Sequence, residues 1–143
     1  MRSALAEFLT REALRQAGLE DKVQVTSAGL HAIAGTEAHP WAKQASADLG
    51  VSLGEHRAKP VSREMVEQAD CILAMDFQNK AELLTLYPES RGKIYMLGAY
   101  AEGPWQYREI PDPYFGNMEI TRYCCHQLRI CIRNLVTSTL RLS

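Results

Sequence analysis

Apolar residues recur at helical spacing in the first part of the chain, with polar residues between them. The stripe that runs from Leu5 to Leu14 predicts a helix over residues 3–17, because positions three and four apart lie on one face of a helix. Gly18 suits the position just past the end of this helix. Residues 40–49 predict a second helix, which opens on a proline and is again followed by a glycine.

Three further helices are predicted from residues that suit the N-cap position, which are Ser62, Asp76 and Asn117. The first two of these helices are short and end near Ala69 and Leu86. The last is long, and one of its sides is lined by Thr121, Cys124, Cys125, Leu128, Cys131, Leu135 and Val136. Three arginines lie away from that stripe: Arg122, Arg129 and Arg133.

Short apolar runs between the helices predict strands. Residues 71–75 form a continuous apolar run, which is typical of a strand buried on both faces of a parallel sheet. Residues 23–26 and 93–97 predict two more strands. Because strands alternate with helices, we expect an α/β fold with a doubly wound parallel sheet. Such a fold normally has a strand before its first helix, so the pattern shows three strands where we expect four.

Composition and charge narrow the classes of function. The 143 residues, 46% of them hydrophobic, are enough for one domain with its own core. A formal net charge of −1 argues against nucleic-acid binding, which needs a basic surface. No apolar run approaches the ~20 residues that span a bilayer, and the N-terminus lacks the apolar core of a signal peptide. We therefore expect a cytoplasmic protein without membrane insertion.

The chain has four cysteines, which are Cys71, Cys124, Cys125 and Cys131. Their spacing to one another and to the histidines is not that of a metal site. Free cysteine behaves as a small hydrophobic residue. We therefore expect buried thiols, no metal site and no cofactor.

A candidate catalytic residue, Asp112, lies between two prolines in the segment Ile110–Phe115, which reads I-P-D-P-Y-F. Each proline fixes its own φ and disfavours the helical conformation in the residue before it. We therefore expect Asp112 on a stiff loop, where its carboxyl group can be aimed at a leaving group as a general acid requires. An ordinary Asp-Pro turn is the alternative interpretation.

The beginning of the chain, Met1–Glu7 (M-R-S-A-L-A-E), resembles the end of the phosphate-binding loop of low-molecular-weight protein tyrosine phosphatases and the helix that follows it. That loop reads C-x-G-N-x-x-R-S, and Arg2 and Ser3 match its last two residues. Residues 27–30 (S-A-G-L) resemble the family's turn after its second strand, and residues 112–114 resemble its D-P-Y general-acid loop. The matches occur in order over nearly the whole chain, and their form is most similar to the bacterial branch associated with exopolysaccharide export.

The resemblance implies a phosphotyrosine phosphatase I-like fold for a single domain over residues 1–143. It also implies that this domain is N-terminally incomplete, since the family's first strand and its nucleophilic cysteine match nothing in the chain and would precede Met1. On this expectation the chain as it stands has no catalytic turnover.

The implied reaction is the hydrolysis of phosphotyrosine through a phosphocysteine intermediate. Arg2 would bind two phosphate oxygens, Ser3 would hydrogen-bond the thiolate or the loop, and Asp112 would protonate the leaving oxygen and then activate water. Ile33 and Tyr114 would form walls of the substrate slot. The implied partner is a phosphotyrosine protein, and an autophosphorylated bacterial tyrosine kinase is one candidate.

Two other functions remain open from the sequence. Without the thiol, the chain would be a catalytically inactive module that binds an anion or phosphotyrosine at the N-terminus of its first helix. An arsenate reductase on the same fold would need additional cysteines to relay a disulfide. Residues 76–92 contain no cysteine, and such an enzyme has no reason to keep the D-P-Y acid.

Overall fold

The computed structural model describes residues 2–101, 109–113 and 116–140. Its α-helices are α1 (Arg2–Gln16), α2 (Pro40–Ala47), α3 (Arg63–Gln68), α4 (Phe77–Leu86) and α5 (Met118–Leu135). Its strands and shorter helical segments are β1 (Ile72–Ala74), η1 (Pro88–Lys93), β2 (Ile94–Met96), η2 (Leu97–Tyr100) and η5 (Val136–Leu140). All five predicted helices are confirmed. Within this described part of the chain, none of the helices has the length and apolar character that crossing a membrane requires.

The strands β1 and β2 form a parallel sheet, with Ile72 opposite Ile94 and Ala74 opposite Met96. The connection between them runs through α4 and η1. Such a crossover is needed because two parallel strands cannot be joined by a tight turn. A parallel sheet whose strands are joined through a helix confirms the α/β class.

The strand predicted over residues 23–26 is wrong. In the described residues the sheet consists of β1 and β2, and residues 23–28 pair with neither strand. Val23 and Val25 instead pack partly buried against the main core. Arg11 donates from its guanidinium to the Val25 carbonyl at 3.2 Å. The apolar alternation of this segment therefore reflects its packing against the core, because strand formation also needs a hydrogen-bonded neighbour.

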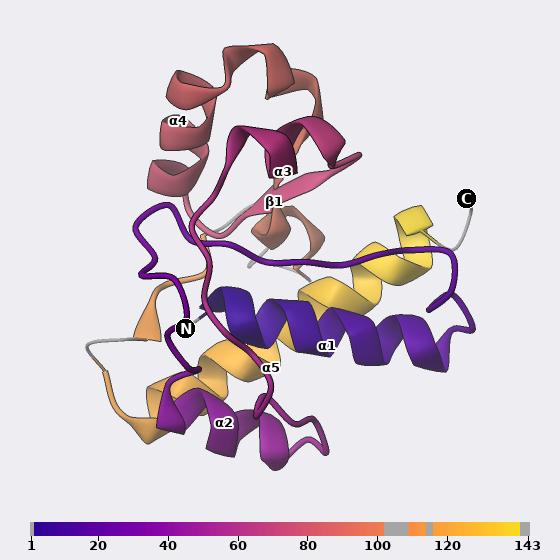
Figure 1. Ribbon diagram of the computed structural model, residues 1–143. Coiled ribbons are helices and arrows are strands. Elements are labelled where there is room, and N and C mark those ends of the chain that lie inside the picture. Colours follow the sequence, from indigo (N-terminus) through magenta and orange to yellow (C-terminus); the bar gives the residue numbers. More distant parts are fainter. Residues whose placement is uncertain (1, 102–108, 114–115, 141–143) are drawn as a thin grey trace.

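Two apolar clusters organise the molecule, and the elements that carry them lie at different ends of the ribbon in Figure 1. The larger cluster joins α1, α2 and α5, and its most deeply buried side chains include Leu5, Leu14, Cys125, Leu128 and Ile132. The smaller cluster lies between the sheet and α4, and its buried residues are Ala74, Leu83, Ile94 and Met96. The residues predicted to line one side of the last helix are all buried.

The caps and glycine turns lie where the sequence predicts them. Ser62, Asp76 and Asn117 each accept a hydrogen bond from a backbone amide in the first turn of α3, α4 or α5. Gly18 and Gly50 follow α1 and α2 with φ of 73° and 79°. Other residues rarely adopt this left-handed conformation, so these two positions favour glycine. Of these signals, the Asp76 cap matters most for the site, because it fixes where α4 begins.

Candidate active site

Arg2 is the first residue of α1, and only 12% of its side chain is exposed. Its Nη1 donates to Asp76 Oδ2 at 3.0 Å and to the Ile110 carbonyl at 2.6 Å. Its Nη2 lies 3.9 Å from Asp112 Oδ2. Three segments that are far apart in the sequence therefore meet at the N-terminus of α1, and two of the predicted site residues, Arg2 and Asp112, are brought together.

The loop that carries Asp112 is anchored on both sides of the carboxylate. Ile110 is buried, and its amide donates to the Met75 carbonyl at 2.9 Å. Pro113 is fully buried. The Asp112 side chain between them is 50% exposed. Its buried neighbours thus hold an accessible carboxylate next to Arg2, in agreement with the stiff loop that the two prolines predict.

Asp76 has two roles, of which the sequence predicted one. Its Oδ1 accepts a hydrogen bond from the Asn79 amide at 2.7 Å, which is the predicted cap of α4. Its Oδ2 accepts from Arg2, which lies 74 residues away in the sequence. The sequence carried no signal for this second contact, because a cap is recognised from local neighbours alone. Asp76 therefore positions the guanidinium of Arg2 against the start of α4.

Phe77 is another residue of this region that sequence reasoning missed. The residue is 57% exposed, and its amide donates to Glu109 Oε1 at 2.7 Å. Phe77 directly follows Asp76, and Glu109 directly precedes Ile110, so this hydrogen bond ties together the two segments that hold Arg2. An aromatic side chain at the start of a helix is more often a packing residue, which is why the pattern gave no hint of an exposed position.

Glu7 connects α1 to the S-A-G-L turn. It is 7% exposed, accepts from the Ser27 hydroxyl at 2.7 Å and forms an ion pair with Arg11 at 2.8 Å. A buried carboxylate needs such partners, because leaving it unpaired in the interior is costly. The two motif segments that contain Glu7 and Ser27 are therefore joined by a direct contact.

The other predicted site residues are Ser3, Ile33 and Tyr114. Ser3 follows Arg2 in the first turn of α1 and is partly buried. At this end of a helix the backbone amides have no partner within the helix. Ile33 is 79% exposed, and its carbonyl accepts from the Thr36 hydroxyl within its own turn, so its place in a substrate slot stays a prediction. Tyr114 lies outside the described residues.

The cysteines of α5 are buried as predicted. Burial raises the pKa of the Cys124 thiol to about 12 and the pKa values of Cys125 and Cys131 to about 11. Since the thiolate is the nucleophile, thiols with such pKa values are unreactive near neutral pH. Cys124 lies beneath the site, with its sulfur 3.9 Å from the Pro111 carbonyl oxygen.

The prediction of a buried thiol is wrong for Cys71, which is exposed. Cys71 directly precedes β1, where the chain has left α3 and has not yet entered the sheet. None of the four cysteines therefore offers a thiolate at the N-terminus of α1.

The arrangement around Arg2 suits a tetrahedral oxyanion. The amides at the start of α1 and the helix dipole favour negative charge there. Because Nη1 of Arg2 donates to Asp76 and Ile110, two oxygens of one phosphate group would be bound by Nε and Nη2 of the guanidinium. The carboxylate of Asp112 is close enough to the same place to exchange a proton with a bound ester.

Comparison with known proteins identifies the family. The family model for low molecular weight phosphotyrosine protein phosphatases matches residues 1–142. The chain belongs to this family. The low molecular weight protein-tyrosine-phosphatase Etp of Escherichia coli K12 is 36% identical over 113 residues, which cover 79% of this chain and 70% of Etp. The probable low molecular weight protein-tyrosine-phosphatase EpsP of Ralstonia nicotianae is 34% identical with the same coverage.

A phosphatase named for another phosphorylated residue is similar over more of the chain. The protein-arginine-phosphatase of Bacillus subtilis is 31% identical over 134 residues, which cover 94% of this chain and 86% of that protein. The solved structure of a YwlE arginine phosphatase mutant with a phosphorylated active-site serine superposes with a TM-score of 0.88 at 29% identity. It covers 99% of this chain and 92% of that one. The expected low-molecular-weight phosphatase fold is thereby confirmed.

Proposed function

We propose that this chain carries the phosphate-binding and acid–base residues of a protein tyrosine phosphatase. The observation that supports this most is the meeting of Arg2, Asp76 and Asp112 at the N-terminus of α1. In this proposal Arg2 binds the phosphate oxygens, Asp76 positions Arg2, and Asp112 is the general acid. The substrate is a phosphotyrosine protein in the cytoplasm, such as an autophosphorylated bacterial tyrosine kinase.

The proposed reaction has two steps. In the first, a cysteine thiolate attacks the phosphorus and the bond from phosphorus to the tyrosine oxygen breaks, while Asp112 gives its proton to that oxygen. In the second, the Asp112 carboxylate takes a proton from water, whose oxygen attacks the phosphorus and displaces the thiolate. Arg2 binds the non-bridging oxygens in both steps, where negative charge must be stabilised.

None of the four cysteines supplies the thiol of this reaction. Three are buried in α5 with raised pKa values, and Cys71 directly precedes β1 instead of lying at the N-terminus of α1. The family resemblance assigns the thiol to the loop that leads into Arg2, and we propose that residues before Met1 supply it. The phosphorylated active-site serine of the YwlE mutant supports a covalent phosphoenzyme in a protein of the same fold. On this proposal the 143 residues alone bind the anion without turnover.

The experiment reads the codons upstream of Met1 in frame and assays the protein that includes them with a phosphotyrosine peptide. We expect an apolar strand, a cysteine in the loop before Met1, and hydrolysis that is lost in the Arg2→Ala variant. If the upstream codons encode no cysteine and the protein binds inorganic phosphate without turnover, the phosphatase proposal fails. A catalytically inactive anion-binding module would then take its place.

Protein-arginine phosphatase activity is a second candidate. The observation that favours it is the match to the Bacillus subtilis enzyme over 94% of this chain. Ile33 is an aliphatic residue in the predicted wall of the slot, so it offers no aromatic ring on which a phosphotyrosine ring could stack. Rates on a phosphotyrosine peptide and on a phosphoarginine peptide of otherwise identical sequence separate the two candidates.

A further inference from the structure

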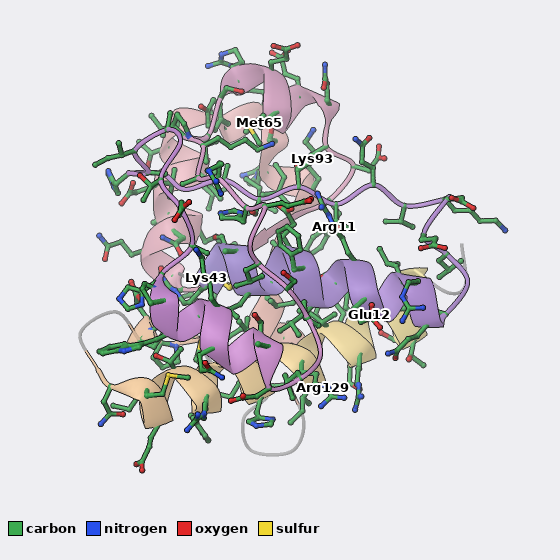
Figure 2. The ribbon with its side chains drawn as sticks, turned by 60° about the horizontal axis from the view of Figure 1, so that its bottom comes forward. Arg11, Glu12, Lys43, Met65, Lys93 and Arg129 are labelled. Atoms are coloured by element: carbon green, nitrogen blue, oxygen red, sulfur yellow. The ribbon has the colours of Figure 1, made fainter. Side chains whose placement is uncertain are left out.

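A small cleft lies between α1 and α5, far from Arg2. Its volume is about 40 Å³. Apolar side chains form much of its lining, among them Leu9, Leu49 and Ile132, and two arginines of α5, Arg129 and Arg133, lie beside them. Figure 2 shows Arg129 together with Glu12 of α1 on the face formed by α1, α2 and α5.

The charge beside this cleft is not balanced. Arg129 and Arg133 are four residues apart on α5 and so lie on the same side of the helix. In the part of the chain that the structure describes, neither guanidinium forms a hydrogen bond or ion pair with another side chain. The acidic residue in the cleft lining, Glu12, is already bound to Arg15, whose Nε donates to it at 3.0 Å. Positive charge therefore remains beside a depression whose lining is partly apolar.

The size of the cleft decides what kind of group it can hold. Sites for small molecules measure roughly 300–1,000 Å³, so 40 Å³ admits little more than one short aliphatic side chain. Arginine pairs bidentately with carboxylates and is enriched at protein interfaces. Binding to a lipid surface needs a broad exposed apolar face, and the large apolar side chains that α5 exposes, Ile120, Tyr123 and Ile130, are not part of the cleft lining.

We propose that the cleft between α1 and α5 docks an acidic segment of a partner protein. One small aliphatic side chain of that segment sits against Ala13 and Leu49, the partly exposed apolar residues of the lining, and carboxylates on either side of it pair with Arg129 and Arg133. Glu12 is ten residues beyond Arg2 on α1, which places the cleft about 15 Å along the helix from the phosphate-binding end. A partner can therefore occupy it while that end stays open, and the inference stands whether or not the chain is a phosphatase.

The experiment measures the fluorescence anisotropy of a labelled peptide, with one valine between glutamates, as the 143-residue chain is added. Reversing both charges with Arg129→Glu and Arg133→Glu is expected to weaken binding by about tenfold or more, because removing one partner of an interfacial charge pair acts on the dissociation rate. Arg91→Glu, which reverses the charge of an exposed arginine of η1 outside the cleft lining, is the control and should leave the affinity nearly unchanged.

A second variant tests the apolar part of the cleft without changing the charge. Ala13→Leu extends a residue of the cleft lining into the depression, and should weaken binding of the valine peptide while the melting curve stays cooperative. Equal weakening by Arg91→Glu would overturn the proposal. Equally tight binding of a peptide with glycine in place of the valine would also overturn it. Binding to anionic phospholipid vesicles, with no binding to the peptide, would overturn it too.

Discussion

The guanidinium of Arg2 and the carboxylate of Asp76 lie 3.0 Å apart although 74 residues separate them in the sequence. The two side chains are 12% and 23% exposed, so water and salt screen this pair less than a surface pair. The same carboxylate caps α4 through the Asn79 amide. Asp76 therefore couples the start of α4 to the guanidinium that we propose binds phosphate.

The variant Asp76→Asn separates these two roles. Asparagine is as good an N-cap as aspartate, so the start of α4 should be kept. The charge that holds Arg2 is lost, and we expect kcat/KM of the complete phosphatase to fall by about tenfold to a hundredfold, since a small misplacement of a catalytic group has effects of this size. The measurement is steady-state hydrolysis of a phosphotyrosine peptide.

Ser62→Ala is the matched control for Asp76→Asn. It removes the cap of α3, which should cost about 1 kcal/mol of stability, but it touches nothing that holds Arg2. We expect its kcat/KM to equal that of the wild type. An Asp76→Asn enzyme with full kcat/KM would show that Arg2 does not depend on Asp76.

The role of Asp112 as a general acid predicts a dependence on the leaving group. In the complete enzyme Asp112→Ala should slow the hydrolysis of phosphate esters with poor leaving groups by ~10²–10⁴, because these leaving oxygens need a proton. Esters with good leaving groups should be slowed much less. Rates over a series of aryl phosphates measure this, and an equal loss across the series would exclude Asp112 from the acid role.

The sequence predicts those parts of the fold whose signals are local. Ser62, Asp76 and Asn117 were recognised as caps, and each caps its helix, because a cap involves only the next few residues. The strand predicted over residues 23–26 failed because pairing depends on a neighbour that is distant in the sequence. Apolar alternation alone cannot distinguish a paired strand from an extended segment that packs on a core.

The same distinction applies to the candidate site. The two prolines around Asp112 predict a stiff loop, and the structure shows an exposed carboxylate in a loop that buried Ile110 and Pro113 anchor. The contact of Arg2 with Asp76 had no sequence signal, because it arises only when α1 and α4 are brought together by the fold. The hydrogen bond from the Phe77 amide to Glu109 was missed for the same reason, since these residues are far apart in the sequence.

The cysteines should differ sharply in reactivity. In the folded 143-residue chain, we expect a thiol reagent to modify exposed Cys71 and to leave Cys124, Cys125 and Cys131 unmodified, because burial excludes the reagent from the α5 thiols. Partial burial also raises the pKa of Cys71, so its modification should be slow at neutral pH and faster at higher pH. The release of the chromophore from a disulfide reagent counts the reactive thiols. Cys71→Ser should abolish the reaction of the native protein, and denaturant should expose the other three thiols.

His56 links stability to pH. Its ring packs edge-on against Phe8, with ring centroids 6.0 Å apart. Burial lowers the pKa of His56 from its ordinary value of 6.5, and the nearby Arg11 and Arg57 act in the same direction, while Glu7 opposes them. The folded protein therefore binds a proton at this site less readily than the unfolded chain does.

The sign of the pH effect follows from this difference in proton binding. Well above pH 6.5 the imidazole is neutral in both states, and its contribution to stability is complete. As the pH falls below 6.5, the unfolded state takes up protons first, and stability is lost until the folded pKa is passed. We expect the melting temperature to fall with acidification over this range, and the fall to be smaller in His56→Gln. His126→Gln, at an exposed histidine of α5, is the matched control and should keep the wild-type pH dependence. If the two variants show the same dependence, His56 is not the group responsible.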